Sequence, residues 1–517
     1  MFRRKKATGT SHPAGKPASI YHHILAHIPE DGPGLSDGGE DLPDTVDDGG
    51  VKWAPGAQDG TLVYHWGGRA DDEEVRRLTL ALRKAATADG HHADAAFEEL
   101  CETAREATVV AAADPVLTSV RETGLAPEAC YRVAYRLATE GRYREPVKLG
   151  IALLGLFDAG LHRDELLVLG RHEEFTLFAA VALSSTEDRA RAEADLWWLA
   201  RRVEGWGRVH LVDRLAGATD PGLREWLLRE GFRNDVDDSY TAVVAAQTGG
   251  LADALAGDPD DELLLAAADL LRTLVSETVP VRGMPDYADG KRATSLFLDH
   301  MASRASDLRH FLAVLDLRRY AEREWPDLVP RCAQILDRPL WADLARRGLA
   351  SQDATEYFRA VQVGDALGLR TLETHLDRLR NGAPFDATAW SAALKQIGPE
   401  TADEVFTLAA ELLPLDEIAS GPAEELGFGE EFAPHHALDL LLHELGKWPG
   451  KGVPLVHAAL SSPVTRNRNL VIRTLDAWGR DAWPPRTAEL VAAALEREPD
   501  GDVRGRFRAL LDGRPIE

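Results

Sequence analysis

The sequence predicts an all-α protein, an α-solenoid in which antiparallel helix pairs stack in a row. Three observations support this fold class. From about Asp71 to the C-terminus, short segments with the apolar spacing of amphipathic helices follow one another. Hardly any segment alternates apolar and polar residues as a half-buried strand does. The connections between segments hold only a few residues, which is typical of antiparallel helix pairs.

Residues 1–50 combine a basic tail with an acidic loop rich in glycine and proline, and we expect them to be partly disordered. Residues 30–51 contain many carboxylates but neither Lys nor Arg, so the alternative is that the basic tail docks on this loop. The tail has no apolar stretch behind its basic residues, and we therefore expect no secretory signal. Between tail and loop, residues 20–28 should form a short helix.

Residues 51–70 are predicted to form a small β-hairpin. Val51–Trp53 and Thr61–Trp66 are the only strand-like runs of the chain. Pro55-Gly56 and Asp59-Gly60, which lie between them, are turn dipeptides.

The helical array begins after this hairpin, and its clearest member is Pro221–Glu230. Asp220 can cap the free amides, Pro221 suits the first helical position, and Gly231 can end the helix in the left-handed conformation. Comparable helices are expected at residues 146–157, 176–183, 190–203, 206–215, 262–275, 308–320, 354–363, 401–412, 437–445, 469–478, 487–495 and 503–511.

Two breaks divide the array. Residues 278–290 contain two prolines and two glycines and are predicted to be a linker or long loop. Residues 413–434 are acidic and rich in glycine, which is also typical of a loop. Helical regions are therefore expected at 71–277, 291–412 and 435–517.

Composition restricts the function classes. Lys and Arg number 59 and Asp and Glu 85, so the net charge is 59 − 85 = −26, which opposes binding to nucleic acid. The three cysteines lie far apart inside helical patterns, as expected of reduced thiols in a cytoplasmic protein. No apolar stretch approaches the roughly 20 residues needed to span a bilayer. We expect a soluble cytoplasmic protein that binds neither membranes nor nucleic acid.

Some helices resemble HEAT repeats. Asp502–Leu511 has the Asp, Val, Arg and spaced apolar residues of the inner helix of such a repeat. Asn469–Leu475 repeats the pattern more loosely, and Glu173–Leu183 is a third partial match. This resemblance implies a HEAT-like solenoid, with the C-terminal region 435–517 as its best-marked part.

Three further segments resemble a bacterial family of helical-repeat proteins, some of whose members are named limonene hydroxylase. They are Val51–Gly60, Gly205–His210 and Trp226–Asn234. The resemblance implies either a monooxygenase acting on a small monoterpene or a label inherited within a largely uncharacterised family. No catalytic motif defines the family, so the resemblance assigns no catalytic residue.

Local motifs give an oxygenase no further support. None of the cysteines lies in the loop expected of a haem-thiolate ligand, and no Gly-x-Gly-x-x-Gly or Glu-x-x-His motif is present. His162-Arg163-Asp164 and His172-Glu173-Glu174 match a His-x-carboxylate pattern, but at helix starts such residues are better explained as caps. Gly34–Gly38 matches Gly-x-Ser-x-Gly without the strand that a nucleophile elbow requires. The catalytic residues are therefore unknown, and no cofactor is expected.

Histidines at helical spacing offer an alternative metal site. His436, Asp439 and His443 share one helix face, with His435 beside them, and His23 and His27 form a second pair. Amphipathic helices also carry histidine on their solvated side. We expect no metal and keep His436, Asp439 and His443 as the alternative ligand set.

An aromatic and basic stretch is the predicted binding surface. It comprises Trp206, Arg208, His210, Trp226, Arg229, Arg233 and Asn234. Tryptophan and arginine are enriched in interface hot spots. The alternative is that Trp226, Leu227 and Phe232 are core, and that Arg229 and Arg233 solvate the helix end or pair with acids. The resulting hypothesis is a non-catalytic scaffold for a protein or peptide partner, with a limonene hydroxylase-like monooxygenase as the alternative.

Overall fold

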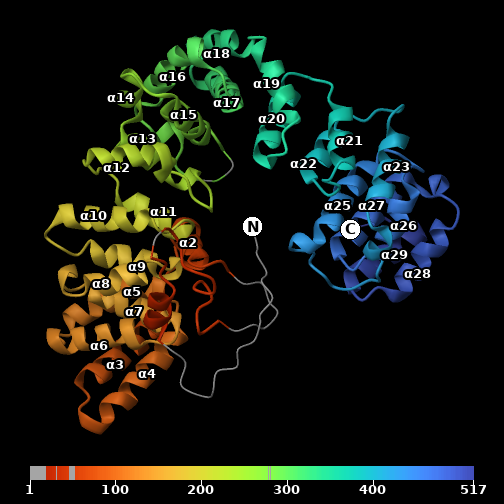
Figure 1. Cartoon of the computed structure of the whole chain (residues 1–517). Coiled ribbons are helices and arrows are strands. Elements are labelled where there is room, and N and C mark those ends of the chain that lie inside the picture. Colours follow the sequence, from red (N-terminus) through yellow and green to blue (C-terminus); the bar gives the residue numbers. More distant parts are fainter. Residues whose placement is uncertain (1–18, 31, 46–52, 278, 280, 517) are drawn as a thin grey trace. The chain divides into compact units, whose positions relative to one another are not determined.

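The computed structural model describes residues 19–30, 32–45, 53–277, 279 and 281–516, and this part of the chain is all-helical (Figure 1). It contains the helices α1 to α29, joined by short turns, and no β-strand. Glu425 and Val464 form an isolated β-bridge. None of the described helices is long and apolar enough to cross a membrane.

The chain divides into two compact units. The first holds the described residues up to 305 together with 312–337, and the second holds 306–311 and the residues from 338 onwards. The predicted breaks at 278–290 and 413–434 therefore each lie inside one unit.

The first unit contains α1 to α16, most of α17, and α18. Its helices are α1 (Ile20–Ala26), α2 (Ala57–Thr61), α3 (Asp72–Thr87), α4 (Ala93–Arg105), α5 (Val109–Glu122), α6 (Pro127–Glu140), α7 (Arg144–Leu154), α8 (Arg163–Leu169), α9 (Glu173–Leu183), α10 (Arg189–Ala200), α11 (Trp206–Arg214), α12 (Pro221–Trp226), α13 (Ser239–Gly249), α14 (Leu251–Ala256), α15 (Asp261–Leu274), α16 (Gly290–Arg304), α17 (Leu308–Glu324) and α18 (Val329–Leu336).

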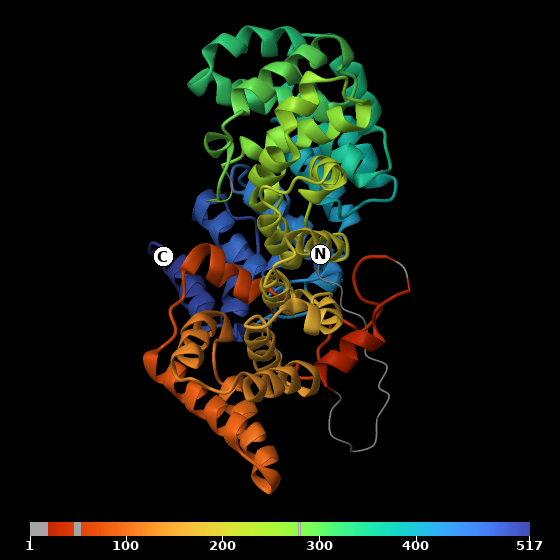
Figure 2. The same cartoon turned by 90° about the vertical axis from the view of Figure 1, so that its left-hand side faces the viewer.

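Alternate helices of the first unit form a continuous row. Helix α3 packs on α5, α5 on α7, α7 on α9, α9 on α11, α11 on α13 and α13 on α15. Figure 2 shows the orange helices α3 and α4 at one end of the unit. Buried side chains such as Phe175 of α9 and Leu211 of α11 fill the space between neighbours. Each helix of the row thus buries its apolar face against the next one.

The second unit has a similar succession of contacts. Its helices are α19 (Leu340–Leu349), α20 (Ala354–Ala366), α21 (Leu372–Arg380), α22 (Ala387–Leu394), α23 (Ala402–Leu412), α24 (Leu415–Ile418), α25 (Ala433–Leu445), α26 (Val453–Ala459), α27 (Thr465–Trp478), α28 (Thr487–Arg497) and α29 (Gly501–Asp512). Helix α20 packs on α22, α22 on α25, α25 on α27 and α27 on α29. Trp341, Tyr357 and Trp390 are fully buried in this unit.

The predicted β-hairpin is wrong. Of its residues, 51 and 52 lie outside the described part, and 57–66 form α2 followed by a π-helical turn, Leu62–Trp66. Gly56, with φ of 70°, provides the left-handed residue before α2, and Gly67, with φ of 57°, ends the π turn. Pro55-Gly56 therefore precedes α2, and Asp59-Gly60 lies within it. The segment is helical because it packs on helices rather than on a partner strand.

The clearest predicted helix, Pro221–Glu230, begins where predicted but ends differently. Asp220 caps α12 by accepting a hydrogen bond from the Leu223 amide at 2.8 Å, as predicted. The helix then continues as a π-helical turn, Leu227–Gly231, and Gly231 is not left-handed. A Cβ atom at Gly231 would lie 2.7 Å from the Trp226 ring, so this glycine is required by close packing instead. The predicted helix at 20–28 is confirmed as α1.

Candidate functional site

The candidate site is built around residues 53–66, here called the crossing segment, which contact four helices of the row. On α7, the Lys148 ammonium lies 2.7 Å from Asp59 Oδ2. On α9, the Gly56 amide donates a hydrogen bond to Glu174 Oε2 at 3.0 Å. Both partners lie in the first two turns of their helices.

The remaining contacts of the crossing segment are with α11 and α13. Gly60 lies directly on the Trp206 ring of α11, where a Cβ atom would come within 2.2 Å of a ring carbon. His65 Nε2 is 2.6 Å from the Tyr240 hydroxyl of α13. Because each contact comes from a different helix, the position of the crossing segment depends on the row being intact.

Lys148 is the most deeply buried charge of the site. Its side chain is 2% exposed, and its Nζ also lies 2.7 Å from Glu174 and 2.8 Å from Glu145. Burial by itself lowers the pKa of Lys148, but the three surrounding carboxylates outweigh it and raise that pKa. Burial raises the pKa of Asp59 to about 6 despite the neighbouring Lys148. The pKa of Glu174 is lowered, because Lys148 and the Gly56 amide outweigh the effect of its burial.

A polar pocket of about 260 Å³ opens beside this cluster. It is lined by Asp44, Gln58, Asp59, Arg105, Ala107, Thr108, Tyr143, Arg144 and Glu145. The Arg144 backbone amide donates to Asp44 at 2.8 Å and its guanidinium donates to the same carboxylate at 3.1 and 3.2 Å. The Arg105 guanidinium lies 4.3 Å from the centre of the Tyr143 ring. The walls thus carry both charge signs, and Asp59 is a carboxyl whose pKa is raised by burial.

An aromatic cluster joins the crossing segment to α11 and α13. The Tyr64 ring lies 5.9 Å from that of Trp206, 5.7 Å from that of His210 and 5.3 Å from that of Tyr240. Burial, together with Arg214, lowers the pKa of His210 to about 3. Burial also raises the pKa of Tyr64 to about 12. Both rings are therefore neutral over the physiological range.

The structure brings three of the predicted binding residues, Trp206, Arg208 and His210, together on α11 but covers them. Trp206 and His210 are 8% and 2% exposed. The Arg208 guanidinium donates to the carbonyl oxygens of Ala200, Val203 and Arg233 at 3.1, 2.9 and 3.0 Å. Trp206 and His210 thus pack against the crossing segment, and Arg208 fixes the connection between α10 and α11.

Trp226 and Arg229 belong to α12 and the π turn that follows it. Trp226 packs on Trp197, with ring centres 6.5 Å apart, and against Gly231. Arg229 donates to both carboxylate oxygens of Asp260 at 2.9 and 2.8 Å. This is the geometry of a bidentate ion pair between neighbouring helices.

Arg233 and Asn234 serve the turn that leads into α13. Arg233 donates to Asp269 at 2.7 Å, and the Asn234 side-chain oxygen accepts from the amides of Val236 and Asp237 at 2.9 and 2.8 Å. The alternative interpretation, in which the aromatic residues pack and the arginines pair with acids, describes these contacts better than a free binding surface.

Two of the three alternative metal ligands, His436 and Asp439, are engaged in other contacts. His436 Nε2 lies 2.7 Å from the Gly427 carbonyl oxygen, Asp439 bonds to Arg466 and Asn467, and His443 is exposed. Over the described ranges, no three His, Cys, Asp or Glu side chains are grouped as metal ligands. His172 caps α9 by accepting from the Glu174 amide at 3.2 Å, as predicted, whereas His162 stands before α8 without a side-chain cap hydrogen bond.

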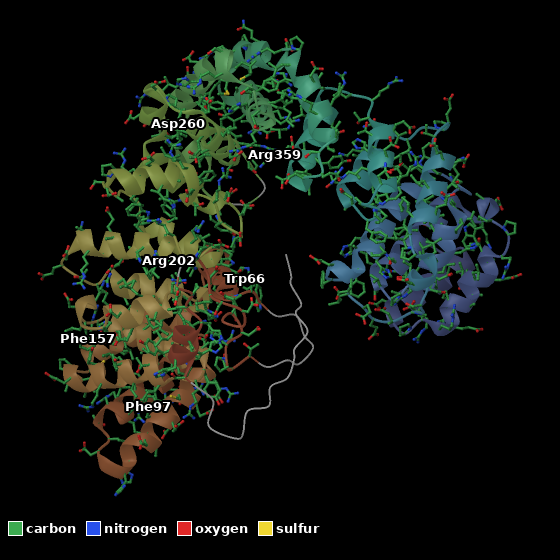
Figure 3. The ribbon with its side chains drawn as sticks, viewed as in Figure 1. Trp66, Phe97, Phe157, Arg202, Asp260 and Arg359 are labelled. Atoms are coloured by element: carbon green, nitrogen blue, oxygen red, sulfur yellow. The ribbon has the colours of Figure 1, made fainter. Side chains whose placement is uncertain are left out.

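The residues that sequence reasoning missed are the exposed apolar side chains of the crossing segment. Trp53 is 59% exposed, Val63 48% and Trp66 65%. Figure 3 labels Trp66 beside the red ribbon. The i, i+3 spacing of Val63 and Trp66 could have indicated a shared helix face, but these residues were assigned to a strand. Exposed apolar side chains are typical of a contact surface for another macromolecule where they form a contiguous patch.

A scan against models of known protein families and a search of curated proteins both give no match for this chain.

Proposed function

We propose that this protein is a non-catalytic helical-repeat scaffold, built of HEAT-like helix pairs, that binds a protein or peptide partner. Support for the solenoid comes from the rows α3–α5–α7–α9–α11–α13–α15 and α20–α22–α25–α27–α29, in which each helix packs on the next. Such stacking creates an extended surface rather than one closed pocket. The free, buried thiols of Cys101, Cys130 and Cys332 agree with a cytoplasmic location.

The observation that carries the proposal is the exposure of Trp53, Val63 and Trp66 on the crossing segment. The contacts of Gly56, Asp59 and Gly60 hold this segment in place before any partner arrives. Binding then costs little ordering entropy, and tryptophan provides large apolar contact area. The proposed interface is therefore the exposed face of the crossing segment.

The test compares three full-length proteins as bait in native lysate. The Trp53→Ala/Trp66→Ala variant removes both exposed rings, and Leu161→Ala removes a side chain that is 67% exposed at another place in the same unit. We expect the wild type and Leu161→Ala to retain the same partner. Capture by the double variant should fall about tenfold or more, which is the effect of losing hot-spot residues. Equal capture by all three baits, or the absence of any reproducible partner, would refute the proposal.

The alternative proposal, a monooxygenase acting on a small monoterpene, rests on the resemblance of Val51–Gly60, Gly205–His210 and Trp226–Asn234 to a family with members named limonene hydroxylase. Visible absorption, metal analysis and oxidation of limonene with supplied electron donors test it directly. A pure sample that absorbs in the visible range, binds metal stoichiometrically or oxidises limonene would favour this alternative.

A further inference from the structure

A cluster of arginines and tryptophans lies at the C-terminal end of α10 and the approach to α9. The Arg202 guanidinium carbon is 3.9 Å from the centre of the Trp198 ring, and that of Arg171 is 6.0 Å from the same ring. The Arg201 guanidinium carbon is 5.7 Å from the Trp197 ring. Figure 3 labels Arg202. We call these five residues the arginine–tryptophan cluster.

No carboxylate of the described chain forms an ion pair with any of the three arginines. Arg171 donates instead to the carbonyl oxygens of residues 32 and 34 at 3.3 and 2.6 Å, and Arg202 to that of Trp198 at 3.0 Å. Burial, and then the neighbouring Arg202, lower the pKa of Arg171. Burial, and then Arg201, lower the pKa of Arg202. Among the described residues, these like charges therefore lie together with no carboxylate paired to them, in a chain whose net charge is −26.

Other arginines of the same protein are neutralised by carboxylates. Arg229 is held by both oxygens of Asp260, and Arg378 donates to Asp386 at 2.7 Å. In the arginine–tryptophan cluster, Arg201 is exposed and Trp198 is 37% exposed, whereas Arg171 is only 3% exposed. The buried Arg171 guanidinium therefore lies near an accessible ring, Trp198, on which a second, partly exposed cation, Arg202, is stacked.

The geometry leaves donors free for a ligand. A guanidinium stacked on an aromatic ring keeps its edge N–H groups available for the two oxygens of a carboxylate. The backbone amide of Gly34 donates to the Arg202 carbonyl oxygen at 2.8 Å, which helps to fix the chain at this position. Trp198, which is 37% exposed, offers apolar contact beside the charges.

We propose that the arginine–tryptophan cluster binds an acidic segment of the protein partner. Carboxylates of that segment pair with Arg201 and Arg202, and an apolar side chain of the same segment packs on Trp198. The inference rests on the proposed scaffold function only in taking the partner to be a protein. It adds the chemistry that the scaffold recognises.

Fluorescence anisotropy with the full-length protein tests this assignment. The probe is a short fluorescein-labelled peptide of alternating Glu and Leu, and its control is the same peptide with Gln in place of Glu. The variant Arg201→Glu/Arg202→Glu reverses the charge of the cluster. Arg189→Glu/Arg191→Glu makes the same change at two exposed arginines at the start of the same helix. Circular dichroism of each variant checks that the fold is retained.

We expect the acidic peptide to bind the wild type and Arg189→Glu/Arg191→Glu equally. Its affinity for Arg201→Glu/Arg202→Glu should be lower by about tenfold or more. Trp198→Ala should weaken binding as well, and the Gln peptide should not bind. Equal binding by both double variants, or by both peptides, would overturn the assignment. Displacement of the peptide by inorganic phosphate at constant ionic strength would also overturn the assignment, because the cluster would then be a site for small oxyanions.

The two proposals fail separately. Trp53→Ala/Trp66→Ala should still bind the acidic peptide, because neither tryptophan belongs to the arginine–tryptophan cluster. Loss of lysate capture with retained peptide binding would refute the interface on the crossing segment alone. Retained lysate capture with no peptide binding would refute the arginine–tryptophan cluster alone.

Discussion

At the scale of single residues, the protein uses buried ion pairs to join parts of the chain that are distant in sequence. Lys148 of α7 pairs with Asp59 of the crossing segment, and in the second unit Arg468 donates to Glu498 at 2.7 Å with both side chains fully buried. Removing water from such charges is costly, so each is stable only while its partners stay in place. The pairs therefore tie local order to the packing of whole helices.

His210 makes stability depend on pH. Its pKa falls from 6.5 to about 3 on folding. Between these two pH values, the unfolded chain carries a proton on His210 and the folded chain does not. Stability from this group is complete above pH 6.5 and is lost as pH falls toward 3. The loss approaches about 1.4 kcal/mol per pH unit at most. On acidification, we therefore expect the unfolding free energy of the wild type to fall relative to that of His210→Phe.

Urea unfolding at a series of pH values measures this effect, when it is monitored by a signal that reports unfolding of the first unit. His172 changes in the same direction and Asp59 in the opposite one, but both are present in either protein and cancel in the difference. His443→Phe, at an exposed position, is the control and should leave the pH dependence unchanged. A difference between wild type and His210→Phe that does not vary with pH would contradict a buried neutral histidine.

Residue roles of this kind were only partly predictable from sequence. The Asp220 cap depends on neighbours in the chain and was predicted. Lys148 lies in an amphipathic pattern that gives no sign of burial. Of the three carboxylates around it, only that of residue 145 is near in sequence, and those of residues 59 and 174 are distant. The alternative of ion-paired arginines, by contrast, anticipated Arg229 and Arg233, because acids are abundant in this composition.

At the scale of elements, the crossing segment shows where local patterns fail. Thr61–Trp66 has the residue types of a strand, yet it forms a helical end, because α11 and α13 offer aromatic faces and no strand edge is present among the described residues. Gly56 and Gly60 were assigned to turns. Their role is close approach, to the Glu173 carbonyl and the Trp206 ring respectively.

Gly60→Ala should therefore detach the crossing segment from α11. The new Cβ would lie 2.2 Å from a Trp206 ring carbon, and relieving that clash costs about 1–3 kcal/mol. We expect faster chymotrypsin cleavage after Tyr64, which is half-buried in the wild type. Gly505→Ala, on α29 with nothing near the new Cβ, is the matched control and should leave this cleavage unchanged. Cleavage at the wild-type rate in Gly60→Ala would mean that the crossing segment tolerates the added methyl group.

At the scale of the whole molecule, the sequence predicted the all-α class because that class depends on apolar periodicity repeated through most of the chain. The division into two units was not predicted. It falls within residues 305–338, and α17 itself begins in the second unit and continues in the first. Pro- and Gly-rich stretches such as 278–290 mark loops, but a loop bounds a unit only when few contacts cross it.

Because each unit has its own core, damage to one core should stay local. Trp390 of α22 is fully buried and donates to the Pro384 carbonyl oxygen at 2.9 Å, so Trp390→Ala leaves both a cavity and an unpaired acceptor. The second unit should lose about 3–5 kcal/mol of stability. Hydrogen exchange measured by mass spectrometry should show reduced protection over residues 338–516 and unchanged protection over 53–277. Phe175→Ala, in α9, should produce the reverse pattern. If either variant reduced protection across both ranges equally, the two units would be one cooperative structure, since independent units cannot share the loss.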